Sequence, residues 1–511
     1  MKAFDFANKL VENIKSVFSK TFGRLDSNIQ TYICVAVCCA LFIAGGVYCL
    51  TYEYYYYALL PVVLLGLLFV VRNMKAAILL IALFTPLSIG MSFKEVAITI
   101  PSEPILILVM LLFFWNWFFT GKFESKILAH PISVAIIINL LWTLITAIFS
   151  EDPIVSLKYL LSQLWFIIPC FYLAVSLFKN IKKANLFIIL YCVSLCVVIC
   201  YATANFGSKG FAFSFAHYSM QPFFNDHTAY GAAIALMIPS VSYFLLYGKK
   251  MGFGNLKMLS IYLLLGVLIL GFILSYSRAA WLSLVAAVGV WVLVKLKLSL
   301  KTYIYGGLAL CLVLALSWGS IMSMFEKNDQ DSSGNMAEHI SSITNISTDD
   351  SNVERLNRWA CALQMFEERP LFGWGPGMYA FVYGSYQKSF NMTQISTDAG
   401  DLGSTHSEYL RPLSEQGLIG MLTNTAVFII TVIMGLRAYN RVEDKKLANL
   451  ALFVVMSLIT YYVHGFLNQF LETDKLAVPF WGLTAIIVAI DLYAPKKVKS
   501  NCIKQDNILE N

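Results

Sequence analysis

The chain has 511 residues, of which 58% are hydrophobic and only 13% charged, and its mean hydropathy is +0.69. Soluble proteins have a nearly even balance of apolar and polar residues, so this composition excludes a soluble enzyme. The formal net charge of +7 does not indicate nucleic-acid binding, because the positive residues lie between apolar runs instead of forming one cluster. The eleven cysteines fall mostly in or beside apolar runs without a CxxC pattern, so neither a disulfide framework nor a metal site is predicted.

Repeated apolar runs predict an all-α, polytopic integral membrane protein. Each run has about 17 to 25 residues, enough to cross a hydrocarbon core of ~30 Å. Some runs are short, so a neighbouring pair could form a re-entrant hairpin, and we expect 12 to 14 transmembrane helices. The candidate spans lie at 31–51, 54–71, 76–91, 104–119, 131–149, 159–178, 184–203, 228–247, 258–275, 279–294, 302–324, 417–436, 447–466 and 476–493.

The distribution of positive charge predicts the orientation of these spans. Most of the 37 Lys and Arg residues lie in alternate loops, starting with the N-terminal segment, and short cytoplasmic loops retain positive charge. Both termini are therefore expected in the cytoplasm. The expected organisation is a cytoplasmic amphipathic segment at 1–29, transmembrane helices 1–11 at 30–324, a large periplasmic loop containing short helices at 325–416, transmembrane helices 12–14 at 417–493 and a cytoplasmic tail at 494–511.

The polar chemistry is expected on the outer side of the membrane. The cores of the expected spans contain no Asp, Glu, Lys or Arg, whereas ion-coupled transporters need such groups inside the membrane. Five of the six histidines fall in outer loops or at outer helix ends: His217, His227, His339, His406 and His464.

The second part of the long loop is expected to contain a helix. Ser351 and Glu354 form an S-x-x-E capping box, which predicts a helix that runs to about Arg369. Arg355 and Arg358 are three residues apart and therefore project from neighbouring positions on this helix. For Arg358, the alternative is a solvated salt bridge with Glu354 one turn earlier.

A glycine-rich turn and a second helix follow. Residues 373–377 (GWGPG) predict a tight, rigid turn. Thr405 and Glu408 form another capping box, which predicts a helix that ends at Gly417. His406 would then lie in the first helical turn, where the positive end of the helix favours a neutral imidazole that can accept a proton. The alternative is that His406 is only a polar residue at a helix cap.

Four ordered blocks of the sequence stand out: 223–240 (FFNDHTAYGAAIALMIPS), 274–282 (LSYSRAAWL), 355–377 (RLNRWACALQMFEERPLFGWGPG) and 406–420 (HSEYLRPLSEQGLIG). In this order they resemble the O-antigen ligase and polymerase family of bacterial membrane glycosyltransferases. The stretch 149–161 resembles an earlier family element, so the likeness covers roughly residues 150–490.

The resemblance implies a GT-C-like helical fold and a defined reaction. A glycan would pass from an undecaprenyl diphosphate carrier to an acceptor hydroxyl, such as a lipid A core sugar, at the periplasmic face of the bacterial inner membrane. Neither a cofactor nor a metal is expected. The outer segments contain no DxD motif or His/carboxylate cluster, so fixed cations must hold the leaving diphosphate. Arginine suits this role, because its planar fork binds phosphate oxygens and stays charged.

The family motifs point to individual residues. Arg278 matches the arginine of the family's Ser-Arg pair, and Arg355 matches the arginine before a tryptophan, here Trp359. His406 matches the loop histidine. The resemblance implies that Arg278 and Arg355, with Arg358, bind the diphosphate, and that His406 orients or deprotonates the acceptor hydroxyl. The alternative for Arg278 is an interfacial anchor that extends toward water.

The chain departs from the family pattern at one donor contact. The family commonly has a further arginine shortly before the segment that here reads FFNDHTAYG, where this chain offers only Lys209, His217 and Gln221. Either Lys209 or His217 could replace that arginine. Asp226 and His227 stand where the family often has Pro-Asn, so we also consider His227 as a substrate contact.

Several functions share the expected donor site. A ligase acting on a lipid A core sugar, a polysaccharide polymerase and a protein O-oligosaccharyltransferase differ only in the acceptor, and the arrangement of the long loop favours the ligase. A flippase for lipid-linked sugars is a different class, because it would move the lipid without changing it chemically. The expected partners are the lipid-linked donor, the hydroxyl acceptor and membrane lipids, but not nucleic acid.

Overall fold

The computed structural model describes residues 60–93, 96–121, 123–296, 350–387 and 403–497, with five single positions between 42 and 51. The chain divides into two compact units. Unit 1 comprises residues 1–78 and 107–123, and unit 2 comprises residues 79–106 and 124–511. The expected amphipathic segment at 1–29, the expected span at 302–324 and the tail from residue 498 lie outside the described residues.

The prediction of a polytopic helical membrane protein is confirmed. Ten of the predicted spans correspond to long helices, and the bounds differ mostly by a few residues. Among the described residues, the helices long and apolar enough to cross a membrane are α5 (Ser102–Thr120), α7 (Pro131–Ile148), α8 to α9 (Pro153–Phe178), α10 (Ile181–Ser208), α12 (His227–Tyr247), α13 (Asn255–Leu274), α14 (Arg278–Leu296), α20 (Leu410–Arg441), α21 (Lys445–His464) and α22 (Asp474–Tyr493).

Shorter elements complete the described chain. In the α8 to α9 segment, α8 ends at Ile167, a π-helical turn follows at Ile168–Leu173, and α9 spans Ala174–Phe178. The others are α3 (Leu60–Arg72), α4 (Met74–Phe84), the 3-10 turn Thr85–Leu87, α6 (Ser125–Leu128), α11 (Phe213–Ala216), the 3-10 turn Lys249–Met251, α18 (Asp350–Glu368), α19 (Tyr379–Val382) and the 3-10 turn Tyr383–Tyr386.

The expected span at 76–91 is wrong beyond residue 87, because a β-hairpin begins there. Strand β1 (Ile89–Phe93) pairs antiparallel with β2 (Val96–Ile100), and Ile89 lies opposite Ile100. Pro86 has no backbone N–H to continue the helix, and the β-branched residues of β2 favour an extended backbone. The helical prediction missed this change because the segment is apolar throughout.

The start of α22 anchors the base of this hairpin within unit 2. The Ser88 hydroxyl donates to the Asp474 carboxylate at 2.6 Å, and the Ser102 hydroxyl donates to the same oxygen. The Lys475 ammonium donates to the carbonyls of Thr85 and Ser88 at 2.6 and 2.5 Å. Lys475 is buried in the first turn of α22, where these carbonyls satisfy its charge.

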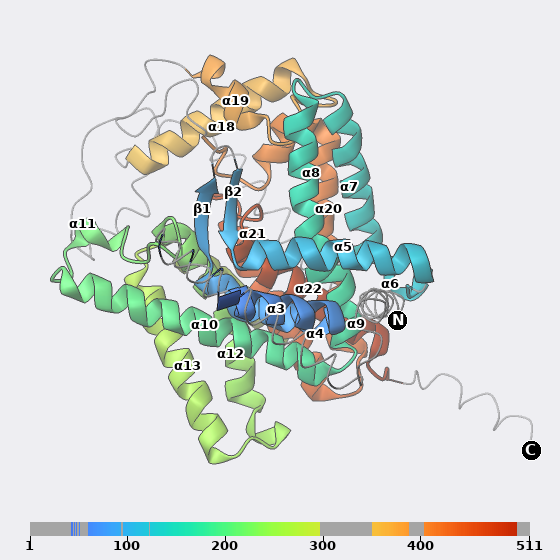
Figure 1. Cartoon of the computed structure of the whole chain (residues 1–511), viewed down its shortest axis with the longest axis vertical. Coiled ribbons are helices and arrows are strands. Elements are labelled where there is room, and N and C mark those ends of the chain that lie inside the picture. Colours follow the sequence, from blue (N-terminus) through green and yellow to red (C-terminus); the bar gives the residue numbers. More distant parts are fainter. Residues whose placement is uncertain are drawn as a thin grey trace, which may run out of the picture. The chain divides into compact units, whose positions relative to one another are not determined.

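Helices α21 and α22 form the centre of unit 2. Their apolar windows are 83% and 89% buried, against 22% for α13 and α14. Helix α21 packs against α12, α14, α20 and α22. Helix α18 lies across the end of this bundle at which α8 and α20 begin (Figure 1). We call this the α18 end of the bundle. The candidate site residues lie there.

Candidate active site

The predicted glycine turn connects α18 to the start of α20. Gly373 has a φ of +65°, and a Cβ atom there would collide with the backbone of Glu415. The Gly375 N–H donates to the Glu415 carbonyl at 2.8 Å. The Glu415 carboxylate accepts from the N–H groups of Gly377 and Tyr379 at 2.9 and 3.1 Å. The turn is therefore rigid, as predicted, and it fixes the position of α18 relative to α20.

Helix α18 spans Asp350–Glu368, which confirms the helix predicted after Ser351. The Ser351 side chain lies outside the described residues, so its capping bond stays a prediction. Glu354 accepts from the Arg358 Nε atom at 2.6 Å, and the two side chains are only 7% and 4% exposed. The predicted salt bridge therefore exists, but it is buried and not solvated.

Arg358 has a structural environment. Its guanidinium lies 4.2 Å from the centre of the Tyr383 ring, and its carbonyl accepts from the Tyr379 hydroxyl at 2.8 Å. A Cβ atom on Gly403 would collide with the guanidinium, so the segment that leads to His406 passes directly over it. Arg358 thus supports the loop that carries His406.

His406 does not lie in a helix, and the predicted capping box is wrong. Its φ is +51°, a left-handed conformation that interrupts a helix. Helix α20 begins only at Leu410, where the Ser407 hydroxyl accepts from the backbone N–H of Leu410 at 3.3 Å. The predicted end at Gly417 matches a break in the backbone there, with φ 70° and ψ −171°.

The environment of His406 favours a neutral imidazole. Burial, followed by the positive charges of Arg355 and Arg358, lowers the pKa of His406 from 6.5 to about 4. The sequence predicted a neutral ring from a helix N-terminus. The structure supports the same protonation state for a different reason, because the histidine is partly enclosed and close to two cations.

Arg278 and Arg355 come from different helices. Arg278 is the first residue of α14, directly after the turn at 275–277. Gly231 of α12 allows this turn to approach closely, since a Cβ atom there would lie 2.7 Å from that of Ser277. Arg355 lies on α18, and its Nε atom donates to the Leu467 carbonyl at 3.1 Å.

Two histidines lie close to this region. The rings of His217 and His227 are stacked, with centres 4.1 Å apart and planes 8° from parallel. His227 is within electrostatic range of both Arg278 and Arg355, and His406 is within range of Arg355. The structure therefore brings five of the predicted site residues together at the α18 end of the bundle.

Lys209 and Trp359 have other surroundings. Lys209 is exposed at the end of α10, where its Nζ atom lies 5.7 Å from the centre of the Phe215 ring. Trp359 is half-buried, and its indole Nε1 atom has no hydrogen-bond partner among the described residues. The structure does not show either residue in contact with the arginines.

The loop between α21 and α22, residues 465–473, connects these groups. Leu467 accepts from Arg355, and the Thr405 hydroxyl donates to Gln469. The Glu408 carboxylate accepts from the N–H groups of Phe470 and Leu471 at 2.9 and 3.0 Å. The segment that carries His406 and the helix that carries Arg355 are therefore tied to the same loop.

Part of the chain matches a known protein family. Residues 262–425 match the family model described as O-antigen ligase. This part of the chain is similar to the O-antigen ligase family. The matched region contains Arg278, Arg355 and His406, and a comparison with curated proteins gives no match.

Members of the O-antigen ligase family are glycosyltransferase-like membrane enzymes that act on lipid-linked glycans. The site offers such an enzyme two cations and a neutral base. In the part of the chain that the structure describes, no three His, Cys, Asp or Glu side chains lie close enough together to hold a metal ion. Sequence analysis missed Glu408 as a connecting residue, although it lies in the block 406–420, because its partners are about 60 positions away.

Proposed function

We propose that this chain transfers a glycan from an undecaprenyl diphosphate carrier to a hydroxyl group of a lipid A core sugar. The transfer takes place at the periplasmic face of the inner membrane, and both chain termini are cytoplasmic. The observation that carries the proposal is the convergence of Arg278, Arg355 and His406 from three separate segments at one end of the bundle. All three lie in the region matched by the family.

The proposed step is a displacement at the sugar carbon bonded to the diphosphate. The acceptor oxygen forms a bond to this carbon while the bond to the diphosphate oxygen breaks. Neutral His406 takes the acceptor proton, which contributes about 10² to 10⁴ in rate. Arg278 and Arg355 stabilise the negative charge that develops on the leaving diphosphate. No metal or cofactor enters this proposal.

Other residues have supporting roles. Arg358 is a positioning residue, since it is buried against Glu354 and lies beneath the segment that leads to His406. The stacked pair of His217 and His227 supplies hydrogen-bond donors to the diphosphate beside the two arginines. Lys209 and Trp359 would contact the substrate only at its periphery.

The test uses purified full-length protein with a glycan linked to undecaprenyl diphosphate and a lipid A core acceptor. Wild-type protein should release free undecaprenyl diphosphate together with glycosylated acceptor. His406→Ala and Arg278→Ala should each lower the rate at least 100-fold. Arg369→Ala is the matched control, because this arginine pairs with Glu151 and both side chains are well exposed. Wild-type rates in both site variants would disprove the assignment.

Two further readouts test the class and the acceptor. A flippase would move labelled lipid across vesicles without releasing free carrier, so that result would exclude a transferase. The glycan profile of a strain that lacks the chain identifies the acceptor. Unextended lipid A core indicates a ligase, whereas single repeats would indicate a polymerase and unglycosylated protein a protein transferase.

A further inference from the structure

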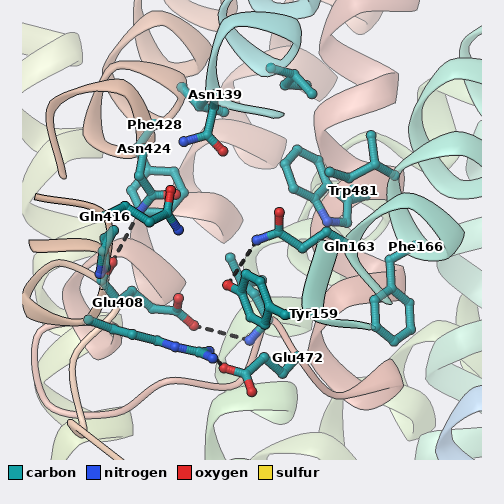
Figure 2. A pocket seen from close by; sticks show the side chains of 16 residues that line it. Asn139, Tyr159, Gln163, Phe166, Glu408, Gln416, Asn424, Phe428, Glu472 and Trp481 are labelled. Carbon is teal, nitrogen blue, oxygen red and sulfur yellow. Dashed lines mark hydrogen bonds and ion pairs between the residues drawn. The ribbon is translucent and has the colours of Figure 1, made fainter. Parts of the chain in front are cut away.

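A second candidate site lies inside unit 2. Figure 2 shows a pocket lined by residues of α7, α8, α20 and α22, and Leu471 and Glu472 of the loop 465–473 also line it. Its cavity volume is about 50 Å³. A buried water needs roughly 10 to 15 Å³, so the pocket holds a small polar group and not a whole glycan. The lining includes four amides and two aromatic rings: Asn139, Gln163, Gln416, Asn424, Phe428 and Trp481.

One polar atom in this lining lacks a partner. Gln163 donates through its Nε2 atom to the Tyr159 hydroxyl at 2.9 Å. Its Oε1 atom is buried and has no hydrogen-bond partner among the described residues. A buried acceptor without a donor costs roughly 1 to 3 kcal/mol, and such groups call for an explanation. A ligand hydroxyl placed in the pocket would supply the missing donor.

The charges in the pocket exclude a diphosphate as its occupant. Arg411 lies 4.5 Å from the centre of the Tyr159 ring, but its guanidinium is neutralised by Glu415 at 3.0 Å and by an ion pair with Glu472. The carboxylate of Glu408 also lines the pocket. The pocket lining is therefore neutral to acidic, unlike the surroundings of Arg278 and Arg355. Amides, carboxylates and aromatic rings together suit an uncharged group that bears hydroxyls.

The segment that carries the proposed base continues into the pocket wall. Glu408 in this wall is two residues after His406, and two residues span at most about 7 Å of chain. The loop 465–473 contacts Arg355 through Leu467 and contributes Leu471 to the pocket lining. The pocket and the proposed base are therefore connected through one short segment and one loop.

We propose that this pocket is an acceptor subsite that binds an uncharged sugar end through Gln163 and Asn424. The inference rests on the proposed function, because it names what His406 deprotonates. The acceptor is favoured over the donor glycan because the segment that carries the base leads into the pocket wall and because the lining has no unpaired cation of the kind a donor diphosphate requires.

Binding can be measured without catalysis. Full-length protein in nanodiscs of phosphatidylethanolamine and phosphatidylglycerol is titrated with the methyl glycosides of glucose, galactose and N-acetylglucosamine, observed by saturation-transfer NMR. At least one glycoside should bind to wild-type protein. Gln163→Leu keeps the side-chain volume but removes the acceptor atom, so it should weaken that binding about tenfold or more. Gln364→Leu on α18 is the matched control, because Gln364 does not line the pocket.

Inorganic pyrophosphate serves as a second probe in the same samples. It should bind equally to wild-type protein and Gln163→Leu, which also shows that the variant is folded, and it should bind weakly to Arg278→Ala. If pyrophosphate does not bind to wild-type protein while a glycoside does, the proposed donor site fails and the pocket stands. If no glycoside binds, or if Gln163→Leu and Asn424→Leu both bind it as wild-type protein does, the subsite proposal is wrong.

Kinetics distinguish the two possible sources of the sugar. Gln163→Leu should raise the KM for the acceptor and leave the KM for the lipid-linked donor unchanged. A raised donor KM with an unchanged acceptor KM would show that the pocket holds the donor glycan and would overturn the assignment.

Discussion

Replacement of Glu408 by alanine tests whether the loop 465–473 holds the site together. The Glu408 carboxylate accepts hydrogen bonds from the backbone N–H groups of Phe470 and Leu471 and from the Tyr461 hydroxyl. Tyr461 is 1% exposed and Glu408 is 9% exposed. Glu408→Ala therefore leaves two donors without an acceptor, the Tyr461 hydroxyl and the partly buried Leu471 N–H, while the Phe470 N–H keeps the Tyr461 oxygen at 3.0 Å.

The magnitude follows from these contacts. Each buried donor left without a partner costs roughly 1 to 3 kcal/mol, and bonds to a charged acceptor lie in the upper part of this range. Two donors lose their acceptor and some water can enter the space left by the side chain, so we expect a total loss of about 2 to 5 kcal/mol in the free energy of unfolding. Glu151→Ala is the control. Its side chain is 53% exposed and pairs with Arg369, and such surface pairs contribute about 0 to 1 kcal/mol.

The assay is equilibrium unfolding of the purified protein in mixed micelles with increasing dodecyl sulfate, followed by circular dichroism. Glu408→Ala should also lower glycan transfer, since the segment with His406 loses its side-chain bonds to the loop whose Leu467 carbonyl accepts from Arg355. An unfolding free energy for Glu408→Ala that stays within about 1 kcal/mol of the Glu151→Ala value would refute the reasoning.

Three further predictions concern the same region. Gly373 and Gly210 share a φ of +65°, but only Gly373 lies against the backbone of another segment. Replacement by alanine should lower the unfolding midpoint at both positions, and clearly more at Gly373. Equal losses at the two positions would contradict the packing argument. Arg358→Leu removes the guanidinium that pairs with the buried Glu354 carboxylate and should cost about 3 to 5 kcal/mol in the same unfolding assay, whereas a loss below about 1 kcal/mol would indicate a solvated pair. The environment of His406 lowers the pKa of its imidazole from 6.5 in the unfolded chain to about 4 in the folded chain. As the pH drops, the unfolded chain therefore binds the proton first, and the free energy of unfolding should fall between pH 6.5 and pH 4. Transfer activity should fall only near pH 4, where the folded chain binds the proton. An activity profile that already declines through pH 6.5, or a pH dependence of stability that His406→Gln does not flatten, would argue against this protonation state.

Much of the helical fold can be predicted from the sequence because the lipid bilayer restricts which backbone structures can cross it. An apolar run that crosses a bilayer must satisfy its own backbone hydrogen bonds, and a helix does so within the segment. The hairpin at 89–100 escaped prediction because its base is held by Asp474 and Lys475, which lie almost 400 residues later in the chain. A local pattern cannot show partners at that distance.

The candidate site also has a part that the sequence predicts and a part that it does not. Motifs located Arg278, Arg355 and His406, because residue type and order carry that information. The predicted helical conformation of His406 was wrong. The Glu408 side chain does not cap a helix there but accepts hydrogen bonds from the N–H groups of Phe470 and Leu471, about 60 positions away. Tertiary hydrogen bonds decided which backbone conformation the segment adopts.

Arg278 and Arg355 lie on elements that differ in how far the rest of the protein encloses them. Arg355 is held by the loop between the two most enclosed helices, whereas Arg278 stands on α14, most of whose apolar window faces outward. A helix in direct contact with lipid tilts as the hydrocarbon layer becomes thicker or thinner, while central helices are fixed by their neighbours. A change in bilayer thickness would therefore change the contact between Arg278 and a diphosphate and leave the geometry around His406 and Arg355 unaltered.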